Sequence, residues 1–129
     1  MLLAIDIGNT NITMGVFRSN ELVATWRMAT DSHRLPDEYG ILIRSLLPLK
    51  GVSSQDIDSM AMCSVVPPLT TVFEELGETH FNVAPLVVGT GTRTGVRILY
   101  DNPRDVGADR VVDAAAAFKL YGGPVIVVD

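Results

Sequence analysis

The stretch Met1-Leu-Leu-Ala-Ile-Asp-Ile-Gly-Asn-Thr-Asn-Ile-Thr-Met-Gly-Val-Phe-Arg18 decides the fold of this chain. An apolar strand leads into an acid at Asp6, a polar turn follows, and a second apolar strand returns. Gly8-Asn9 between two apolar runs predicts a hairpin, because both residues tolerate a positive φ. We therefore expect paired strands over about 2–7 and 11–18, joined by a tight turn.

The same turn carries groups that can bind a phosphate. The Asp6 carboxylate can handle a cation, usually through water, and the glycine N–H can approach an anion. Amide and hydroxyl donors follow at Asn9, Thr10 and Asn11. This set suits a nucleotide phosphate with its metal ion. An ordinary hairpin uses the same residue types to satisfy its own turn, so the residues alone leave both interpretations open.

Composition limits the class of protein. The chain has 129 residues, of which 47% are hydrophobic and 19% charged, which is typical of one globular unit with a real core. Its net charge of −5 argues against a nucleic-acid partner, because no basic stripe exists to displace counterions. No apolar run approaches the ~20 residues that span a bilayer. The sequence therefore predicts neither a nucleic-acid-binding nor a membrane protein.

The N-terminus and the cysteine count indicate the compartment. Asp6 interrupts what would be the apolar part of a secretory signal, so we do not expect export. The single cysteine, Cys63, lies in an apolar run, cannot form an internal disulfide and is interpreted as an inert core thiol. A reducing, cytoplasmic setting fits these features best.

The rest of the chain predicts alternating helices and strands. A helix begins at Pro36-Asp37-Glu38, where proline and acids suit a first turn, and apolar residues recur at helical spacing through Leu49. The other expected elements are strands over 21–29, 57–66, 84–88, 95–99 and 125–129, and helices over 68–78 and 105–121. Three antiparallel strands followed by this alternation define an α/β layered domain. The glycines of 89–95 are misplaced for a dinucleotide-binding fingerprint, and no P-loop is present.

The end of the chain resembles its beginning. Val125 to Asp129 repeats the pattern of Leu2 to Asp6, an apolar strand followed by an acid. A duplicated fold would begin its second half at this point. We therefore expect one domain over 1–123 and the first strand of a second, truncated domain of the same fold over 124–129, so that the chain is a segment of a longer protein.

This organisation resembles a known superfamily. Three strands, alternating helices and strands, an Asp-x-Gly-Asn-Thr turn and a hint of a second copy are similar to the duplicated ribonuclease-H-like fold of the acetate and sugar kinase, Hsp70 and actin superfamily. The resemblance implies an actin-like ATPase domain that binds ATP between two related halves, with one phosphate loop from each.

Three motifs narrow the resemblance to one family. They are Asp6-Ile-Gly-Asn-Thr10, Ser64-Val-Val-Pro67 and Tyr100-Asp-Asn-Pro-Arg-Asp-Val-Gly-Ala-Asp-Arg110. With these motifs intact and in order, the whole chain resembles the N-terminal half of a type III pantothenate kinase. The resemblance implies ATP-dependent phosphorylation of pantothenate to 4′-phosphopantothenate, the first step of coenzyme A synthesis. It also implies a homodimer, a monovalent cation (potassium or ammonium) and Mg²⁺ with the ATP.

The resemblance assigns residues to these roles. The ATP-binding segment corresponds to Asp6, Ile7, Gly8, Asn9, Thr10, Asn11, Ile12 and Thr13. The pantothenate-contacting positions correspond to Tyr100, Gly107, Ala108, Asp109 and Arg110, with Asp109 as the catalytic base. Asp129 matches an acid that helps to bind the monovalent cation. Because the second phosphate loop is missing, the segment alone is expected to be inactive.

The residues around Asp109 support part of this assignment by themselves. Asp105, Asp109 and Asp113 are spaced at i, i+4 and i+8, so one helix through all three would stack them on one face, where like charges disfavour ionisation of the middle one. Arg110 can pair with a substrate carboxylate through its planar fork. Asp105 is interpreted as dipole compensation at a helix start, and Asp113 as a solvated acid.

Other polar residues are weaker candidates. His33 and His80 have no Cys or His at ligand spacing and are interpreted as surface residues, and Arg93 and Arg97 are either substrate-side or merely exposed. Two rival functions stay open at this point. One is a non-catalytic ATP-binding regulator of the same fold, and the other is an actin-like structural element.

Overall fold

A computed structural model describes residues 1–89 and 91–128, apart from the side chain of Arg104. Its strands form one five-stranded sheet in the order β3-β2-β1-β4-β5. The strands are β1 (Leu2–Ile7), β2 (Asn11–Arg18), β3 (Glu21–Ala29), β4 (Ser59–Ser64) and β5 (Leu86–Val87). Strands β1 to β3 pair antiparallel, whereas β4 runs parallel to β1 and β5 parallel to β4. The sheet is thus mixed, and the predicted α/β class is confirmed.

The hairpin between β1 and β2 forms as predicted, but Gly8 is needed there for a reason other than a positive φ. Ile7 pairs with Ile12, and the Gly8 N–H donates to the Asn11 carbonyl at 3.0 Å. A Cβ on Gly8 would lie 3.0 Å from that carbonyl oxygen, so glycine is favoured because the backbone passes closely. A positive φ was expected at Gly8 and Asn9, but neither residue has one. Ser19, in the next turn, has one at 56°.

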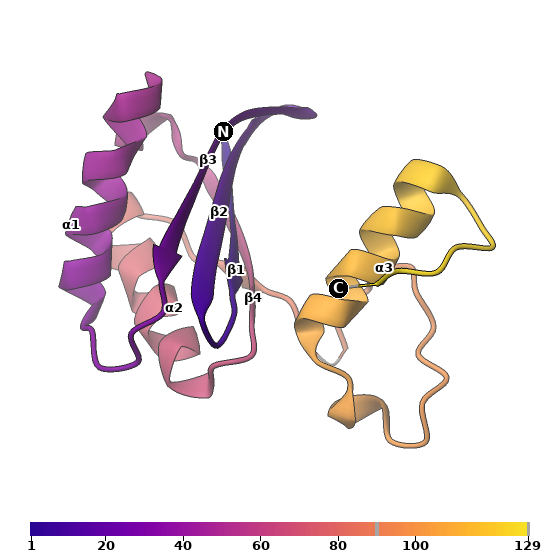
Figure 1. Ribbon diagram of the computed structural model, residues 1–129. Coiled ribbons are helices and arrows are strands. Elements are labelled where there is room, and N and C mark those ends of the chain that lie inside the picture. The colour runs from indigo at the N-terminus through magenta and orange to yellow at the C-terminus, as the bar shows by residue number, and fades with distance from the viewer. Residues whose placement is uncertain (90, 129) are drawn as a thin grey trace.

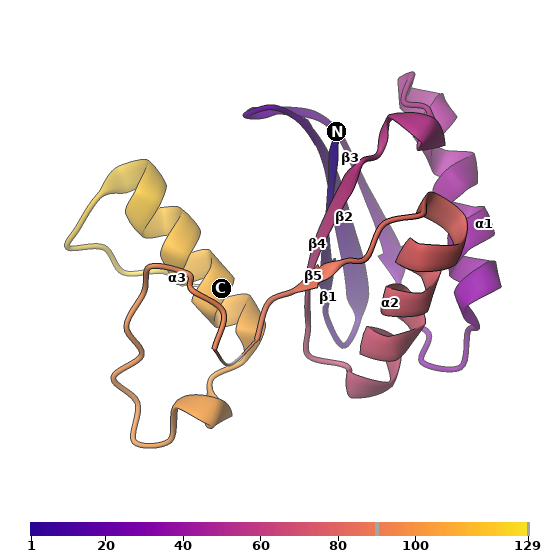
Figure 2. The same ribbon diagram turned by 180° about the vertical axis from the view of Figure 1, so that it is seen from behind.

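One face of the sheet carries the core. Alternate residues of β1 and β2 point to this face and are almost fully buried, because side chains alternate along a strand. Helices α1 (Pro36–Leu46) and α2 (Pro67–Phe81) cover it, as Figures 1 and 2 show from opposite sides. Tyr39 and Phe73 meet there with ring centroids 4.9 Å apart. Each fully buried large apolar side chain contributes roughly 1.5–3 kcal/mol to stability.

The two helices approach closely where His80 lies. A Cβ on Gly40 of α1 would collide with the His80 ring of α2. His80 Nε2 lies 2.8 Å from Asp37 Oδ1, and its side chain is only 13% exposed. The interpretation of His80 as a surface residue was therefore wrong, whereas His33 is 95% exposed as expected. Pairing to Asp37 is what allows an imidazole to lie between two helices.

The remainder of the chain departs from the sheet. After β5 a long loop leads to the short 3₁₀ helix η3 (Pro103–Asp105) and then to α3 (Ala108–Tyr121). Figures 1 and 2 place α3 on the side of the sheet opposite to α1 and α2. In the part of the chain that the structure describes, no helix is long and apolar enough to cross a membrane.

Three expectations about this remainder were wrong. The predicted strand over 95–99 does not form, and the predicted helix begins at Ala108 rather than 105. Residues 125–128 form no strand, and Ile126 and Val128 are about 90% exposed. For the two strands the reason is that a strand needs a neighbour to satisfy its backbone groups, and no strand among the described residues pairs with 95–99 or 125–128.

Candidate active site

The candidate site begins at the carboxyl ends of β1 and β4. Asp6 pairs with Thr13 of β2 on one side and with Cys63 of β4 on the other. The Cys63 thiol donates a hydrogen bond to Asp6 Oδ1 at 3.2 Å. The Asp6 side chain is exposed, while Cys63 is buried. Strands β2 and β4 therefore flank Asp6 and hold its carboxylate at the carboxyl end of β1.

Acidic residues near the Cys63 thiol, including two from α3, affect its pKa. Burial, the hydrogen bond to Asp6 and the negative charges of Asp6, Asp109 and Asp113 raise the pKa of this thiol to about 12. The thiol therefore stays protonated and donating near neutral pH. Val112 of α3 lines the same cavity as Asp6 and Cys63, so the start of α3 lies near the Asp6 end of β1. The sequence placed Cys63 in the core correctly but missed both relationships.

The turn after β1 presents free donors, although not the one expected. The Gly8 N–H is already bonded to Asn11, so it cannot also bind an anion. The backbone N–H groups of Asn9 and Thr10, by contrast, donate to no residue in the described ranges, and both residues are exposed. The side chains of Asn11 and Thr13 are likewise exposed and without a bonded neighbour among the residues that the structure places. A row of unengaged donors next to a carboxylate suits a metal-bound phosphate.

Two of the predicted ATP-binding residues have their side chains in the core. Ile7 and Ile12 are both 0% exposed, on the face covered by α1 and α2. The Ile7 carbonyl accepts a hydrogen bond from the Val65 N–H at 3.0 Å. Any part that they play at a phosphate is therefore to hold the backbone of the turn in place.

The acids before and within α3 do not form the stack that their spacing suggested. The Asn102 amide donates to Asp105 Oδ1 at 2.9 Å, and the Asp105 N–H donates to the Asn102 carbonyl at 2.9 Å. Asp105 thus belongs to η3, before α3 begins. Asp109 and Asp113 do lie in α3 one turn apart. The predicted row of three acids on one helical face was wrong.

Asp109 and Arg110 lie in the first turn of α3. Gly107 precedes the helix, and a Cβ on it would collide with Asp109 Oδ1. That oxygen accepts the Arg110 N–H at 2.9 Å. The Arg110 side chain is exposed and forms no ion pair with a residue that the structure describes, so its guanidinium is available for a substrate anion. Tyr100 is 62% exposed in the preceding loop.

Two cavities adjoin this helix start. One, of about 410 Å³, lies between the loop after β5 and α3 and includes Ser64, Thr92, Thr94 and Ala108. The other, of about 620 Å³, lies between Asp109, Arg110 and Asp113 and the apolar tail at Val125 to Val128. Arg93 and Arg97 are exposed and line neither cavity. Asp129, predicted for the monovalent cation, lies outside the described residues.

The fold defines the class of protein. The chain is similar in structure to a crystal structure from Porphyromonas gingivalis described as a "Putative N-acetylglucosamine Kinase", with a TM-score of 0.51 and 15% sequence identity. The match covers 73% of this chain and 37% of that one, so this chain spans little more than a third of the neighbour's length. The fold is that of the actin-like ATPase kinases, which confirms the predicted ribonuclease-H-like class.

Residues 2–129 also match a family model described as type III pantothenate kinase. The chain belongs to this family, as the three motifs predicted. The match spans almost the whole sequence and includes the turn after β1, the end of β4 and the start of α3.

Proposed function

We propose that this chain is the N-terminal half of an ATP-dependent pantothenate kinase, which forms 4′-phosphopantothenate. Family membership supports the chemistry. The observation that carries the proposal is that Asp6 and Cys63, which are joined by a hydrogen bond, line one cavity together with Val112 of α3. The candidate phosphate turn and the candidate acceptor site therefore lie near each other, as transfer of a phosphoryl group between them requires.

In this proposal the turn after β1 binds the phosphates of ATP. Asn9 and Thr10 would donate backbone N–H groups, and the exposed Asp6 carboxylate would orient Mg²⁺, mostly through water. Within the described ranges, no group of three acidic, histidine or cysteine side chains could hold a metal ion. We infer that Mg²⁺ arrives with the phosphates and is held chiefly by them, and that when bound it neutralises their charge.

The start of α3 would handle the acceptor. Asp109 would receive the proton of the pantothenate hydroxyl as that oxygen attacks the γ-phosphorus of ATP, the bond to the β–γ bridging oxygen breaks and ADP leaves. Arg110 would pair with the pantothenate carboxylate. Gly107 supports this arrangement because its missing Cβ makes room for the Asp109 carboxylate. Tyr100 and Ala108 complete the proposed pantothenate contacts.

Other parts of the proposal concern what this chain does not carry. We propose that 124–129 begin a second domain of the same fold, whose phosphate loop closes the other side of the ATP site. Asp129 would bind potassium or ammonium there, and the active protein would be a homodimer. On this basis the 129-residue chain by itself should not phosphorylate pantothenate.

The test compares the full-length protein with the 129-residue chain. Each is purified free of host kinase and incubated with ATP, Mg²⁺ and pantothenate, in potassium and in sodium buffers, and 4′-phosphopantothenate is detected by mass spectrometry. We expect product from the full-length protein, more of it in potassium, and none from the short chain. A full-length protein that ATP stabilises against heat, but that pantothenate does not stabilise and that forms no product, would instead be an ATP-binding regulator.

A further inference from the structure

The residue that follows β3 holds the turn after β1 from outside. The Thr30 hydroxyl donates to the Gly8 carbonyl at 2.7 Å, and the Thr30 N–H donates to the Thr10 carbonyl at 2.9 Å. The two bonds engage the backbone on either side of Asn9, across some twenty residues of sequence. The side chain of one partly buried residue thus holds the Gly8 carbonyl, and its backbone N–H holds the Thr10 carbonyl.

Thr30 is itself anchored to the core through the next residue. The Tyr39 hydroxyl accepts the Asp31 N–H and donates to the Asp31 carbonyl, both at 2.9 Å. Tyr39 is 0% exposed and packs on Phe73, so this anchor does not move with the surface. A path of contacts therefore runs from the α1–α2 core through Asp31 to the turn.

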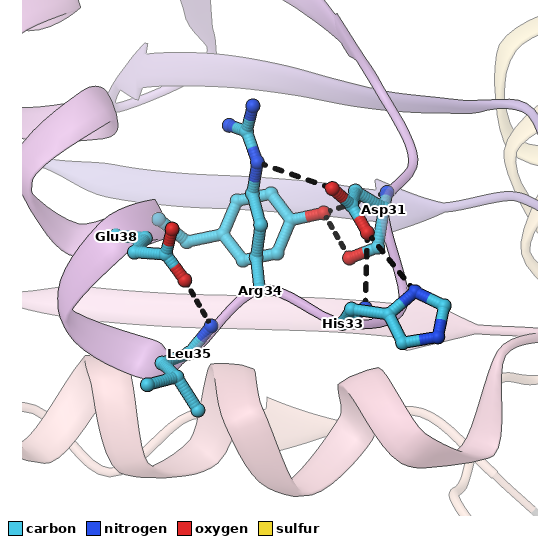
Figure 3. Close-up of polar contacts among 6 residues, drawn as sticks. Asp31, His33, Arg34, Leu35 and Glu38 are labelled. Atoms are coloured by element: carbon cyan, nitrogen blue, oxygen red, sulfur yellow. Dashed lines mark hydrogen bonds and ion pairs between the residues drawn. The ribbon is translucent and has the colours of Figure 1, made fainter.

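The Asp31 side chain stabilises the segment after Thr30 through contacts with His33 and Arg34. Asp31 Oδ1 accepts the His33 N–H at 3.0 Å, and Asp31 Oδ2 lies 3.6 Å from Arg34 Nε (Figure 3). The His33 N–H, with a smaller contribution from Arg34, holds the pKa of Asp31 below its usual value. The carboxylate is therefore charged at neutral pH and keeps both partners.

Holding a carbonyl also aims the amide on the other side of the same peptide unit. In a trans peptide the C=O of one residue and the N–H of the next point in opposite directions. When Thr30 holds the Gly8 C=O, the Asn9 N–H points away from Thr30, and this N–H has no bonded partner among the residues described. A glycine peptide left free could rotate and present its carbonyl, which would repel an anion.

We propose that Thr30 is a positioning residue that keeps the turn after β1 in its phosphate-binding orientation. The proposal deepens the proposed function, on which it rests, by naming a residue that touches neither nucleotide nor pantothenate. Preorganisation of this kind reduces the entropy that the turn loses when the ligand binds. Its loss should weaken binding of the phosphate chain and spare binding of pantothenate.

The test uses Thr30→Val and Thr30→Ser in the full-length protein. Valine keeps the shape and removes the hydroxyl, whereas serine keeps the hydroxyl. Calorimetry measures the Kd of ATP, inorganic tripolyphosphate and pantothenate. We expect Thr30→Val to weaken ATP and tripolyphosphate binding by about tenfold, the usual range for one lost hydrogen bond, and to change pantothenate binding less than about twofold. Thr30→Ser should restore the wild-type values.

Thr25→Val is the matched control. Thr25 lies on β3, the strand that Thr30 follows. It is exposed, and its hydroxyl bonds to no residue within the described ranges, so its loss should leave all three Kd values unchanged. Kinetics give a second measurement, in which Thr30→Val should raise the KM for ATP more than it lowers kcat, because the reacting groups stay in place.

Several outcomes would overturn the proposal. Wild-type affinity for tripolyphosphate in Thr30→Val, failure of serine to restore it, or equal weakening of all three ligands would each show that Thr30 is only structural. The proposed function fails separately. A wild-type protein that makes no phosphopantothenate, yet binds tripolyphosphate in a Thr30-dependent way, would keep this proposal and remove that one. A wild-type protein that binds neither ATP nor tripolyphosphate would overturn both.

Discussion

The chain up to the end of β5 (residues 1–87) and the segment around α3 (described over 91–128) differ in how they are held together. Every buried hydrophobic residue in the described ranges lies between Leu3 and Phe81. Helix α3, by contrast, buries none of its side chains, and Phe118, Leu120 and Tyr121 are 60–81% exposed. The first part has a core of its own, whereas the second carries the proposed catalytic residue without one. Stability and acceptor chemistry are therefore assigned to different regions.

The open face of the sheet shows why the second part is thinly packed. It carries small side chains at Ala4, Gly15 and Ala61, and an apolar cavity of about 330 Å³ lies between them and Val112 of α3. Small residues leave little surface for α3 to bury, so hydrophobic stabilisation there is weak. The proposed second domain would supply the missing cover.

The largest expected effect concerns function in the thinly packed part. In the full-length enzyme, Asp109→Asn keeps the size of the side chain but cannot accept the proton of the pantothenate hydroxyl. We expect kcat to fall by roughly 10²–10⁴-fold, the usual contribution of a positioned general base. Pantothenate Kd and the melting temperature should change little, because Asp109 is not part of a core.

Steady-state kinetics, direct pantothenate binding and thermal unfolding of the same preparation check this prediction. A variant with near-normal kcat would show that Asp109 is only a first-turn acid of α3. Loss of folding along with activity would instead break the contrast between the two parts, since the chemistry would then depend on packing at α3.

The next prediction tests stability in the two parts of the chain, with one substitution in each. In the 129-residue chain, Phe73→Ala removes a ring that is 0% exposed and should cost about 3–5 kcal/mol of unfolding free energy. Phe118→Ala removes one that is 60% exposed and should cost less than about 0.5 kcal/mol. Urea unfolding measures both.

Repeating the pair in the full-length protein sharpens the comparison. If the second domain covers α3, Phe118→Ala should cost more there than in the short chain, while Phe73→Ala should cost about the same. Equal costs for the two variants in the short chain would contradict the division into a packed part and a thinly packed part.

The smallest expected functional effect concerns Cys63, which links the two parts. Cys63→Ala removes the donor to Asp6 and should raise the KM for ATP by about fivefold, whereas Cys63→Ser keeps a donor and should stay near wild type. Because burial and neighbouring acids raise the thiol pKa to about 12, the folded protein at pH 8 should react with iodoacetamide far more slowly than the unfolded chain.

The negative charges near Cys63 determine how pH and substitution should change its alkylation rate. Raising the pH should increase the rate, and Asp6→Asn should increase it at constant pH, because loss of a neighbouring negative charge lowers the thiol pKa. A thiol that reacts as fast in the folded protein as in the unfolded chain would show that Cys63 is not held between these acids.

Much of the first part could be predicted because its signals are local. Alternating apolar residues gave β1 and β2, and Pro36 with two acids marked the start of α1. Which side of α1 is buried was harder to predict from the sequence. Tyr39 and Ile43 face the core, while Ile41 is 66% exposed. An eleven-residue helix with apolar residues on several sides does not reveal which stripe the sheet will cover.

The family motifs named the residues of the candidate site, Asp6 and Asp109 among them, and their roles stay predictions. The contacts of these residues were not predictable from the motifs. The Asp6–Cys63 bond follows from the parallel register of β1 and β4, in which the two carboxyl ends meet at one sheet edge.

By itself, the sequence determined the elements up to β5, the family and the residue types at the candidate site, because strand alternation, helix starts and motifs are properties of short segments. The tertiary structure alone decided that Thr30 holds the turn, that Cys63 bonds to Asp6 and that Asp105 stands apart from α3. These are contacts between segments or breaks in a helix that spacing would continue. Pairing register and packing determine them, and both depend on the whole sheet and the helices that cover it.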